Sequence, residues 1–284
     1  MIQSKSSEGK IKSADLVYDS NRPRLAIFAD IAELARYRDL LWSLVQRDLT
    51  VRYKRSVLGF LWTMLNPLLM MLVQTIVFSA LFQGMIEHFA VYLLSGTILW
   101  NFFAQSTTMA MNNLIWAGGL VNKIYVPKSV FVVSAIFVGL VNLLLALIPL
   151  TLIILFTGPP FSFALLFLPI PILLTFMFAL GVGLIVATLA VFFVDVVDIY
   201  QVGLMVVMYL TPLFYPITII PESYRSFFHL NPIYYFIEIF RQPIYQGVLP
   251  EPYLVLRAAL VAVTALIVGW WVFTKKSNEF AYRV

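Results

Sequence analysis

Long apolar stretches, separated by short polar segments, dominate the chain from residue 57 onward. Each approaches or exceeds the ~20 residues that a helix needs to cross a hydrocarbon layer about 30 Å thick. The pattern therefore predicts an all-α integral membrane protein whose transmembrane domain covers residues 56–275. Its six predicted transmembrane helices lie at residues 57–83, 90–112, 129–157, 163–194, 199–217 and 253–274.

The segment before the first span has a different pattern. Apolar and charged residues alternate at helical spacing over residues 29–55, which predicts an amphipathic helix at the cytoplasmic face with Trp42 as an interfacial anchor. Residues 1–28 are polar and predict a flexible cytoplasmic tail. No signal peptide is expected, so the first span is retained. The apolar positions of the amphipathic helix are Ile31, Leu34, Leu41, Leu44, Val45 and Leu49.

Residues 218–250 separate the last two spans but do not form a polar loop. Pro221 and Pro232 can each start a short helix at its first position. Neither helix is long enough to cross, so we expect two short re-entrant helices that dip into the outer leaflet. The alternative is an amphipathic hairpin that rests on the outer surface.

Composition and charge support a membrane protein and fix its expected orientation. Of the 284 residues, 61% are hydrophobic and only 12% are charged, against about 25% charged in a soluble domain. With the amino terminus inside, Arg225, Arg241 and Arg257 are the only ones of the 19 lysines and arginines that fall outside. Cytoplasmic loops carry the excess of basic residues, so both termini, including the tail 276–284, are expected in the cytoplasm. The net charge of +5 therefore reflects topology and not nucleic-acid binding.

The sequence offers little chemistry of its own. It has no cysteine, no phosphate-binding loop and no metalloprotease or serine-hydrolase motif. His88 and His229 stand alone and are expected to be interfacial polar residues, so we predict no catalytic or metal site. Ionisable groups such as Asp195 and Asp198 lie at a cytoplasmic turn and not within the spans. Ion-coupled carriers usually place such groups within the membrane, so another chain is expected to supply the energy.

Several passages resemble the membrane subunits of ABC-type polysaccharide exporters. The first is RDLTVRYKRSVLGFLWTMLNPLL at 47–69, and others are VNKIYVPKSVF at 121–131 and NPIYYFIEIFRQPIYQG at 231–247. The resemblance also includes FFVDVVDIYQVGLMVVMYLTPLFYP at 192–216 and covers roughly residues 30–275. It implies an inner-membrane permease, not an enzyme, that exports a lipid-linked polysaccharide such as O-antigen or teichoic acid. No cofactor is expected in this chain.

The resemblance also implies partners. Two copies of the permease would pair with two ATP-binding-cassette subunits, which bind ATP and Mg. Residues 30–55 and the loop 113–128 match the two elements that contact those subunits. The alternative for the loop lysines is simple anchoring at the cytoplasmic face. The implied coupling residues are Arg47, Arg52, Lys54, Arg55, Lys123, Tyr125, Pro127 and Lys128.

The outer hairpin matches the gate of this family. Glu238 is expected either near the dimer axis or paired with Arg241, three positions away on the same helix face. The implied gate residues are Asn231, Pro232, Glu238, Arg241 and Gly247.

A glycan channel needs aromatic faces for sugar C–H groups and polar side chains for sugar hydroxyls. The alternative is that these aromatics only fill helix interfaces, as they do in any membrane protein. The candidates for channel lining are Trp100, Asn101, Phe102, Phe103, Gln105, Tyr209, Phe214 and Tyr215.

Two other functions remain open on sequence grounds. The same architecture suits a permease for a drug or a small lipid. A membrane glycosyltransferase or ligase would need outer carboxylates, for which Glu222, Glu238 and Glu251 are available. Gly181 and Gly183 could permit close contact between helices, including those of two copies.

Overall fold

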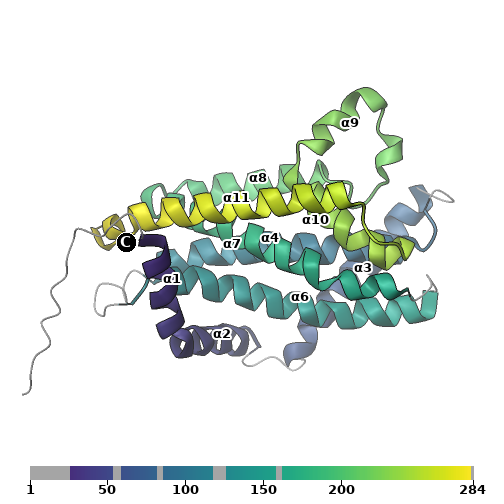
Figure 1. Cartoon of the computed structure of the whole chain (residues 1–284). Helices are drawn as coiled ribbons and strands as arrows, with labels where there is room; N and C mark the ends of the chain where they lie inside the picture. The colour runs from purple at the N-terminus through teal and green to yellow at the C-terminus, as the bar shows by residue number, and fades with distance from the viewer. Residues whose placement is uncertain (1–25, 54–58, 82–85, 118–125, 158–161, 283–284) are drawn as a thin grey trace, which may run out of the picture.

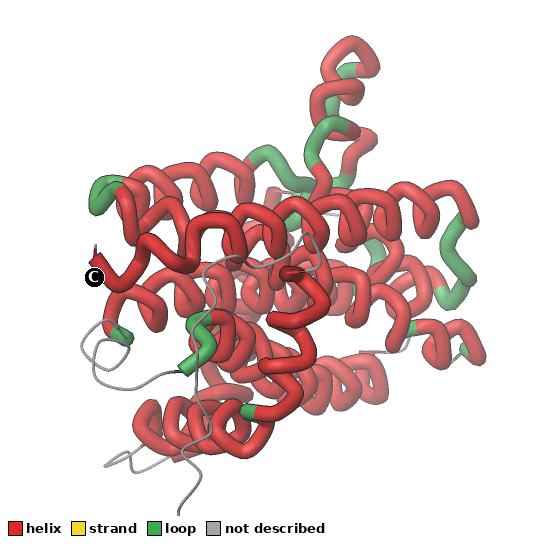
Figure 2. Tube along the Cα trace, turned by 60° about the vertical axis from the view of Figure 1, so that its left-hand side comes forward, coloured by secondary structure: helices red, strands yellow, loops and turns green. Residues whose placement is uncertain are grey.

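The structure is a computed structural model, and every element that it describes is a helix (Figure 2). The expected tail lies outside the described residues except at its last few positions. The structure describes residues 26–53, 59–81, 86–117, 126–157 and 162–282.

Within the described residues, three stretches are long and apolar enough to cross a membrane. They are α6 (Ser129–Thr157), the run Phe163–Phe192 and α11 (Pro252–Lys276). The middle run joins a 3-10 turn, η2 (Phe163–Phe167), to α7 (Pro169–Phe192). In Figure 1 these helices run alongside one another as a bundle.

Two more long helices complete the bundle, one at its centre and one at its edge. α4 (Phe89–Trp116) has 28 residues and is therefore roughly 42 Å long, but polar side chains interrupt its apolar sequence. It packs along both α6 and α7. α3 (Trp62–Leu81) follows a short turn, η1 (Gly59–Leu61), and contacts α4 and α6. Most large side chains of α3 remain exposed, as suits a helix at the edge of the bundle.

Close packing of α7 on α11 depends on two glycines. A Cβ atom on Gly269 would lie 2.1 Å from the carbonyl oxygen of Gly181, and one on Gly181 would lie 2.3 Å from the carbonyl of Ala265. Gly183 instead faces Ile136 of α6. Both glycines that the sequence offered for helix contact are thus used inside one chain.

The expected span at 199–217 is wrong in its extent. α8 (Val196–Tyr209) has only 14 residues, and the chain then leaves helical geometry up to residue 216. Pro212 and Pro216 explain the break, because proline lacks an N–H and disfavours helix in the residue before it. The irregular residues are nevertheless buried, among them Thr211 and Leu213.

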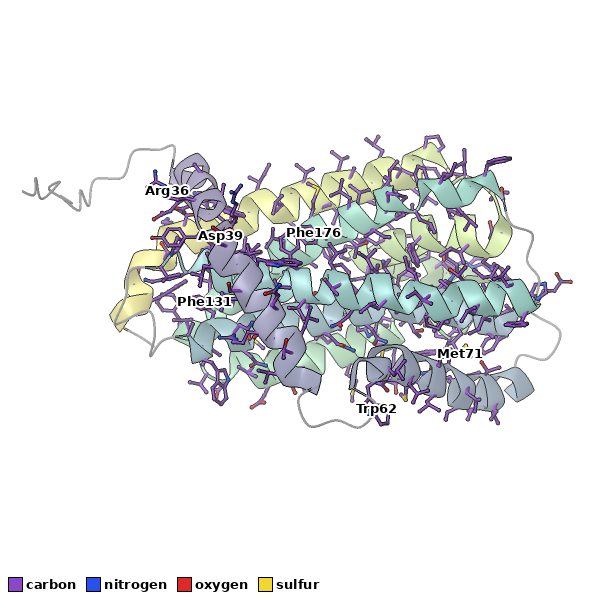
Figure 3. The ribbon with its side chains drawn as sticks, turned by 90° about the horizontal axis from the view of Figure 1, so that it is seen from below. Arg36, Asp39, Trp62, Met71, Phe131 and Phe176 are labelled. Atoms are coloured by element: carbon purple, nitrogen blue, oxygen red, sulfur yellow. The ribbon has the colours of Figure 1, made fainter. Side chains whose placement is uncertain are left out.

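The single amphipathic helix expected at 29–55 is also wrong, because the structure has two helices. α1 (Ala26–Arg36) and α2 (Arg38–Tyr53) meet at Tyr37, and Figure 3 shows Arg36 and Asp39 beside this bend. Each helix packs on a different neighbour: α1 contacts α11, whereas α2 lies along α6.

The apolar face of α2 buries Leu44 and Val45 completely or nearly so. Leu44 packs in a small cluster with Val126, Val130 and Phe131 at the start of α6. Trp42 is 56% exposed, as an interfacial anchor requires.

The outer hairpin differs from the expected pair of equivalent helices. α10 (Pro232–Arg241) packs against α4, α7 and α11, with Phe236 and Phe240 fully buried. α9 (Glu222–His229) buries no residue and stands out from the bundle in Figures 1 and 2. Of the two helices, only α10 packs into the bundle, because most of its side chains are apolar or aromatic, whereas α9 carries Glu222, Arg225 and His229 among its eight residues.

The remaining short elements precede α9, follow α10 or follow α11. η3 (Ile217–Ile219) precedes α9, and a π-turn, η4 (Gln242–Gln246), follows α10. After α11, the 3-10 segment η5 (Ser277–Tyr282) folds back toward the bundle.

Candidate functional site

A polar stripe runs along the accessible face of α4. Its members repeat every three or four residues, so they lie on one side of the helix. Neighbouring positions such as Phe102, Ser106 and Ala110 are buried. The stripe spans about 22 Å at 1.5 Å per residue and consists of Thr97, Asn101, Gln105, Thr108 and Asn112.

The three amides of this stripe are free to bind a ligand. Within the part of the chain that the structure describes, no hydrogen bond occupies Asn101, Gln105 or Asn112. The hydroxyls of Thr97 and Thr108 donate to carbonyl groups of their own helix, which leaves their oxygens able to accept. The stripe therefore offers several donors and acceptors but no charge.

Two adjoining cavities follow the stripe, and we call them together the groove. The outer cavity has a volume of about 910 Å³ and is walled by α3, α4, α6 and α8. The inner cavity, of about 420 Å³, continues along α4 to Asn112. Gln105, Gly139 and Asn142 border both cavities, so they form a waist between them.

Gly139 lets α6 pack closely against α4 at the floor of the groove. A Cβ atom at this position would lie 2.6 Å from the Cβ of Ser106 and 3.2 Å from the Phe102 ring. Any larger residue would push α6 away from α4. Next to it, the Oδ1 atom of Asn142 is buried and has no hydrogen-bond donor among the described residues.

Six of the eight expected lining residues border the outer cavity: Trp100, Asn101, Phe102, Gln105, Tyr209 and Phe214. Phe103 and Tyr215 do not. The Phe103 ring stacks on Phe178 at 5.2 Å inside the core, and the Tyr215 hydroxyl donates to the carbonyl of Tyr209 at 2.6 Å.

Sequence reasoning missed several polar lining residues. Asn66 and Gln74 of α3 and Asn142 of α6 face the outer cavity, and Asn112 faces the inner one. A usable signal was present, because uncharged amides recur four or eight residues apart within otherwise apolar spans. The lining candidates from the sequence are mainly aromatic, and these four amides are not among them.

A buried arginine lies beside the end of the groove at Thr97. Arg241 of α10 is 3% exposed and donates from Nη1 to the carbonyl of Pro212 at 3.1 Å. Its guanidinium carbon lies 3.8 Å from the centroid of the Tyr92 ring. Gly96, which precedes the groove residue Thr97, leaves room for it, since a Cβ there would lie 2.3 Å from Nη2.

This arginine stabilises the irregular segment after α8. The Tyr92 hydroxyl also donates to the carbonyls of Pro212 and Tyr215, at 3.2 and 3.0 Å. Non-helical backbone at membrane depth is tolerated only where protein groups satisfy it. Arg241 and Tyr92 supply those groups.

The other expected gate residues shape α10. Glu238 pairs with Arg241 at 3.3 Å, which is the local alternative of the two expected for it. Asn231 caps the helix by accepting from the Ile233 N–H at 3.1 Å, and Pro232 occupies the first helical turn. Gly247 ends the hairpin with a φ of 68°, a conformation that favours glycine.

At the end of α4 opposite to α10, Asp48 joins α2 to α4. Its carboxylate accepts from the Asn113 side chain at 3.1 Å and pairs with Arg47 at 2.7 Å. The Asp48 side chain is 8% exposed and that of Arg47 is 53% exposed. Of the expected coupling residues, Arg47 is thus accessible, while the Arg52 side chain, Lys54, Arg55, Lys123 and Tyr125 lie outside what the structure describes.

Lys128 is not a free cytoplasmic contact. Its ammonium group donates to the carbonyl of Ser277 and lies 5.4 Å from the centroid of the Phe280 ring. Burial lowers the pKa of Lys128. Pro127 precedes it at the start of α6, where its carbonyl accepts from the Val130 N–H. Lys128 is therefore engaged by η5, and its expected contact with an ATP-binding subunit stays a prediction.

The carboxyl-terminal segment η5 is anchored firmly. Phe280 is 2% exposed and meets Phe273 at 5.3 Å and Phe192 at 6.0 Å, both edge to face. One turn earlier, Thr274 donates to Asp30 of α1 at 2.7 Å. The carboxyl-terminal end of α11 and the adjoining η5 thus touch α1, the start of α6 and the end of α7.

The remaining ionisable residues form no reaction centre in the described ranges. No group of three metal-ligating side chains occurs there. His229 packs edge to face on Tyr234 at 5.2 Å, and His88 precedes α4 with a positive φ. Asp195, which precedes α8, and Asp198, in the first turn of α8, are both exposed.

Comparisons with known proteins agree on one family. A family model described as "ABC-2 type transporter" matches residues 39–245. The O-antigen export system permease protein RfbA of Myxococcus xanthus is 33% identical over 257 residues, covering 89% of this chain and 98% of the relative. The protein of the same name from Klebsiella pneumoniae is 31% identical over 86% of this chain and 94% of its own length. The polysialic acid transport protein KpsM of Escherichia coli is 23% identical over 80% and 89%.

Proposed function

The chain belongs to the ABC-2 type transporter family, and we propose that it is the permease of an exporter that moves a lipid-linked polysaccharide, of the O-antigen kind, out of the cytoplasm. The printed functions of its relatives support this substrate class. The observation that carries the proposal is the groove along α4, which combines aromatic walls with uncharged amides. Such a surface can stack on sugar rings and bond their hydroxyls.

Membrane permeases of this family work with ATP-binding subunits. In our proposal two copies of this chain pair with two such subunits, and ATP and Mg bind there. The chain crosses the inner membrane six times, with α8 and the irregular segment 210–216 together forming the fifth crossing, and both termini lie in the cytoplasm. The distribution of basic residues supports this orientation.

α11 is the element through which motion would reach the outer side. At its cytoplasmic end it is bonded to α1 through Thr274 and to Lys128 through Ser277. Near its other end, Arg257 donates to the Tyr235 hydroxyl of α10 at 3.1 Å. A displacement of the cytoplasmic elements by the ATP-binding subunits would therefore move α10 as well.

The outer gate opens, in this proposal, when α10 withdraws from α4. Arg241 would leave the Tyr92 ring and the Pro212 carbonyl, and the segment 210–216 would lose one of its donors. Because Gly96 beside Arg241 adjoins Thr97 in the groove, that withdrawal extends the groove outward.

Reconstitution tests the proposal directly. We expect proteoliposomes that hold this chain, its cognate ATP-binding subunit and a lipid-linked glycan to move the glycan inward to the lumen only with ATP. Gln105→Leu should abolish export, whereas Leu260→Ala on the exposed face of α11 should not, since Leu260 is 61% exposed and outside the groove. Equal transport of the lipid carrier without its glycan would instead favour a small-lipid exporter.

A further inference from the structure

The lining of the groove is uncharged throughout. None of the described residues that border the outer or inner cavity is an aspartate, glutamate, lysine, arginine or histidine. The polar groups are amides and hydroxyls, each of which can meet a sugar hydroxyl as donor or acceptor. Nearby cations do not point into the groove, since Arg241 is buried against Tyr92 and Pro212.

The waist is lined by the same kind of uncharged polar group. Gln105 of α4 and Asn142 of α6 each border both cavities, as does Gly139, which has no side chain. The Oδ1 atom of Asn142 is buried and lacks a donor in the described part of the chain. A buried acceptor without a partner is costly, and a rotation of the Asn142 side chain toward the waist would let a ligand hydroxyl satisfy it.

We propose that the waist formed by Gln105, Gly139 and Asn142 is the recognition point for the exported chain, and that it selects an uncharged glycan over an acidic one. This inference rests on the proposed function and specifies its substrate class. A sugar carboxylate at the waist loses its water and meets no cation there, and an unpaired charge is far costlier to bury than a hydroxyl. A neutral sugar meets donors and acceptors that match it.

Two reconstituted substrates test the selection. They are lipid-linked glycans of equal length, one of neutral hexoses and one containing a uronic acid in every repeat. We expect the chain to export the neutral glycan at least about tenfold faster, as a site matched by hydrogen bonding discriminates by that much or more. Equal rates would overturn the inference and leave the proposed function standing, whereas no export of either glycan would count against the proposed function itself.

Variants at the waist test whether the preference for a neutral glycan arises there. Asn142→Lys supplies a cation, so we expect the ratio of neutral to acidic export to fall by about tenfold. Asn142→Asp has the same shape with the opposite charge, and the ratio should rise or stay high. Thr151→Lys on an exposed position of the same helix is the matched control and should leave the ratio unchanged. A ratio that responds equally to the lysine at either position would overturn the assignment to the waist.

Discussion

Arg241 of α10 lies with its guanidinium carbon 3.8 Å from the centroid of the Tyr92 ring of α4. Both side chains also bond to the carbonyl of Pro212. One contact thus joins the outer hairpin, the first turns of α4 and the break after α8. In the proposed function this contact holds the outer gate closed.

Loss of the arginine should open that end. Arg241→Met keeps the length of the side chain but leaves Glu238 without its partner and removes one donor to Pro212. We expect stability to fall by about 2 kcal/mol, the usual cost of a hydrogen bond to a charged group. Proteoliposomes with the variant should leak a small neutral sugar without ATP. Glu222→Gln, on the exposed helix α9, is the control and should remain tight, and an equally tight Arg241→Met would refute the gate role.

The contact between Asp48 and Asn113 should carry force from α2 to α4. In a double-mutant cycle, Asp48→Ala and Asn113→Ala are expected to show a coupling of about 0.5–3 kcal/mol, as for residues in direct contact. Asp48→Asn should keep the complex with the ATP-binding subunit but reduce export per ATP hydrolysed. Additive effects of the two alanine variants would show that the contact transmits nothing.

Phe280 should be required although it lies near the end of the chain. Phe280→Ala removes the ring that meets Phe273, Phe192 and Lys128. Truncation of a buried phenylalanine costs about 3–5 kcal/mol, so we expect η5 to detach and hydrogen exchange of its amides to increase. Phe163→Ala provides the matched control, since that ring is 92% exposed. Unchanged exchange at residues 277–282 in the Phe280 variant would contradict this description.

The contact between Gly181 and Gly269 should not tolerate a methyl group. Gly269→Ala forces α7 and α11 apart and should destabilise the chain by about 1–3 kcal/mol. Gly203→Ala in α8 meets no atom within 4 Å and should be neutral or stabilising by about 0.5–1 kcal/mol. Thermal unfolding in detergent compares the two, and equal midpoints would argue against the close approach.

Much of the fold can be predicted from the sequence, because the length of an apolar stretch directly indicates the extent of a membrane-spanning helix. α6 has the same limits as the stretch expected from apolar residues alone, at 129–157. The end of α8 could have been placed from Pro212 and Pro216, which forbid the helix that hydropathy suggested. The bend at Tyr37 could not, because it arises when α1 and α2 pack on different helices.

The lining of the groove could be predicted only in part, because residue type alone does not show which side chains face it. Trp100 and Asn101 were recognisable as lining candidates from residue type, and both border the outer cavity. Phe103 has the same residue type as Phe102, and only packing against Phe178 removes it from the groove. The engagement of Lys128 by Ser277 joins residues 149 positions apart, so no local pattern reports it.

Accessibility of the groove is the most direct test of the central claim, that the glycan passes along the polar stripe of α4. Because the chain has no cysteine, single cysteines at Asn101, Gln105 and Asn112 can be labelled with a small water-soluble maleimide. We predict that all three react in the resting transporter and become protected when a lipid-linked glycan is stalled by a non-hydrolysable ATP analogue, while a cysteine at Ser226 on α9 reacts equally in both states. Groove cysteines that react at the same rate with and without the stalled glycan would contradict the account.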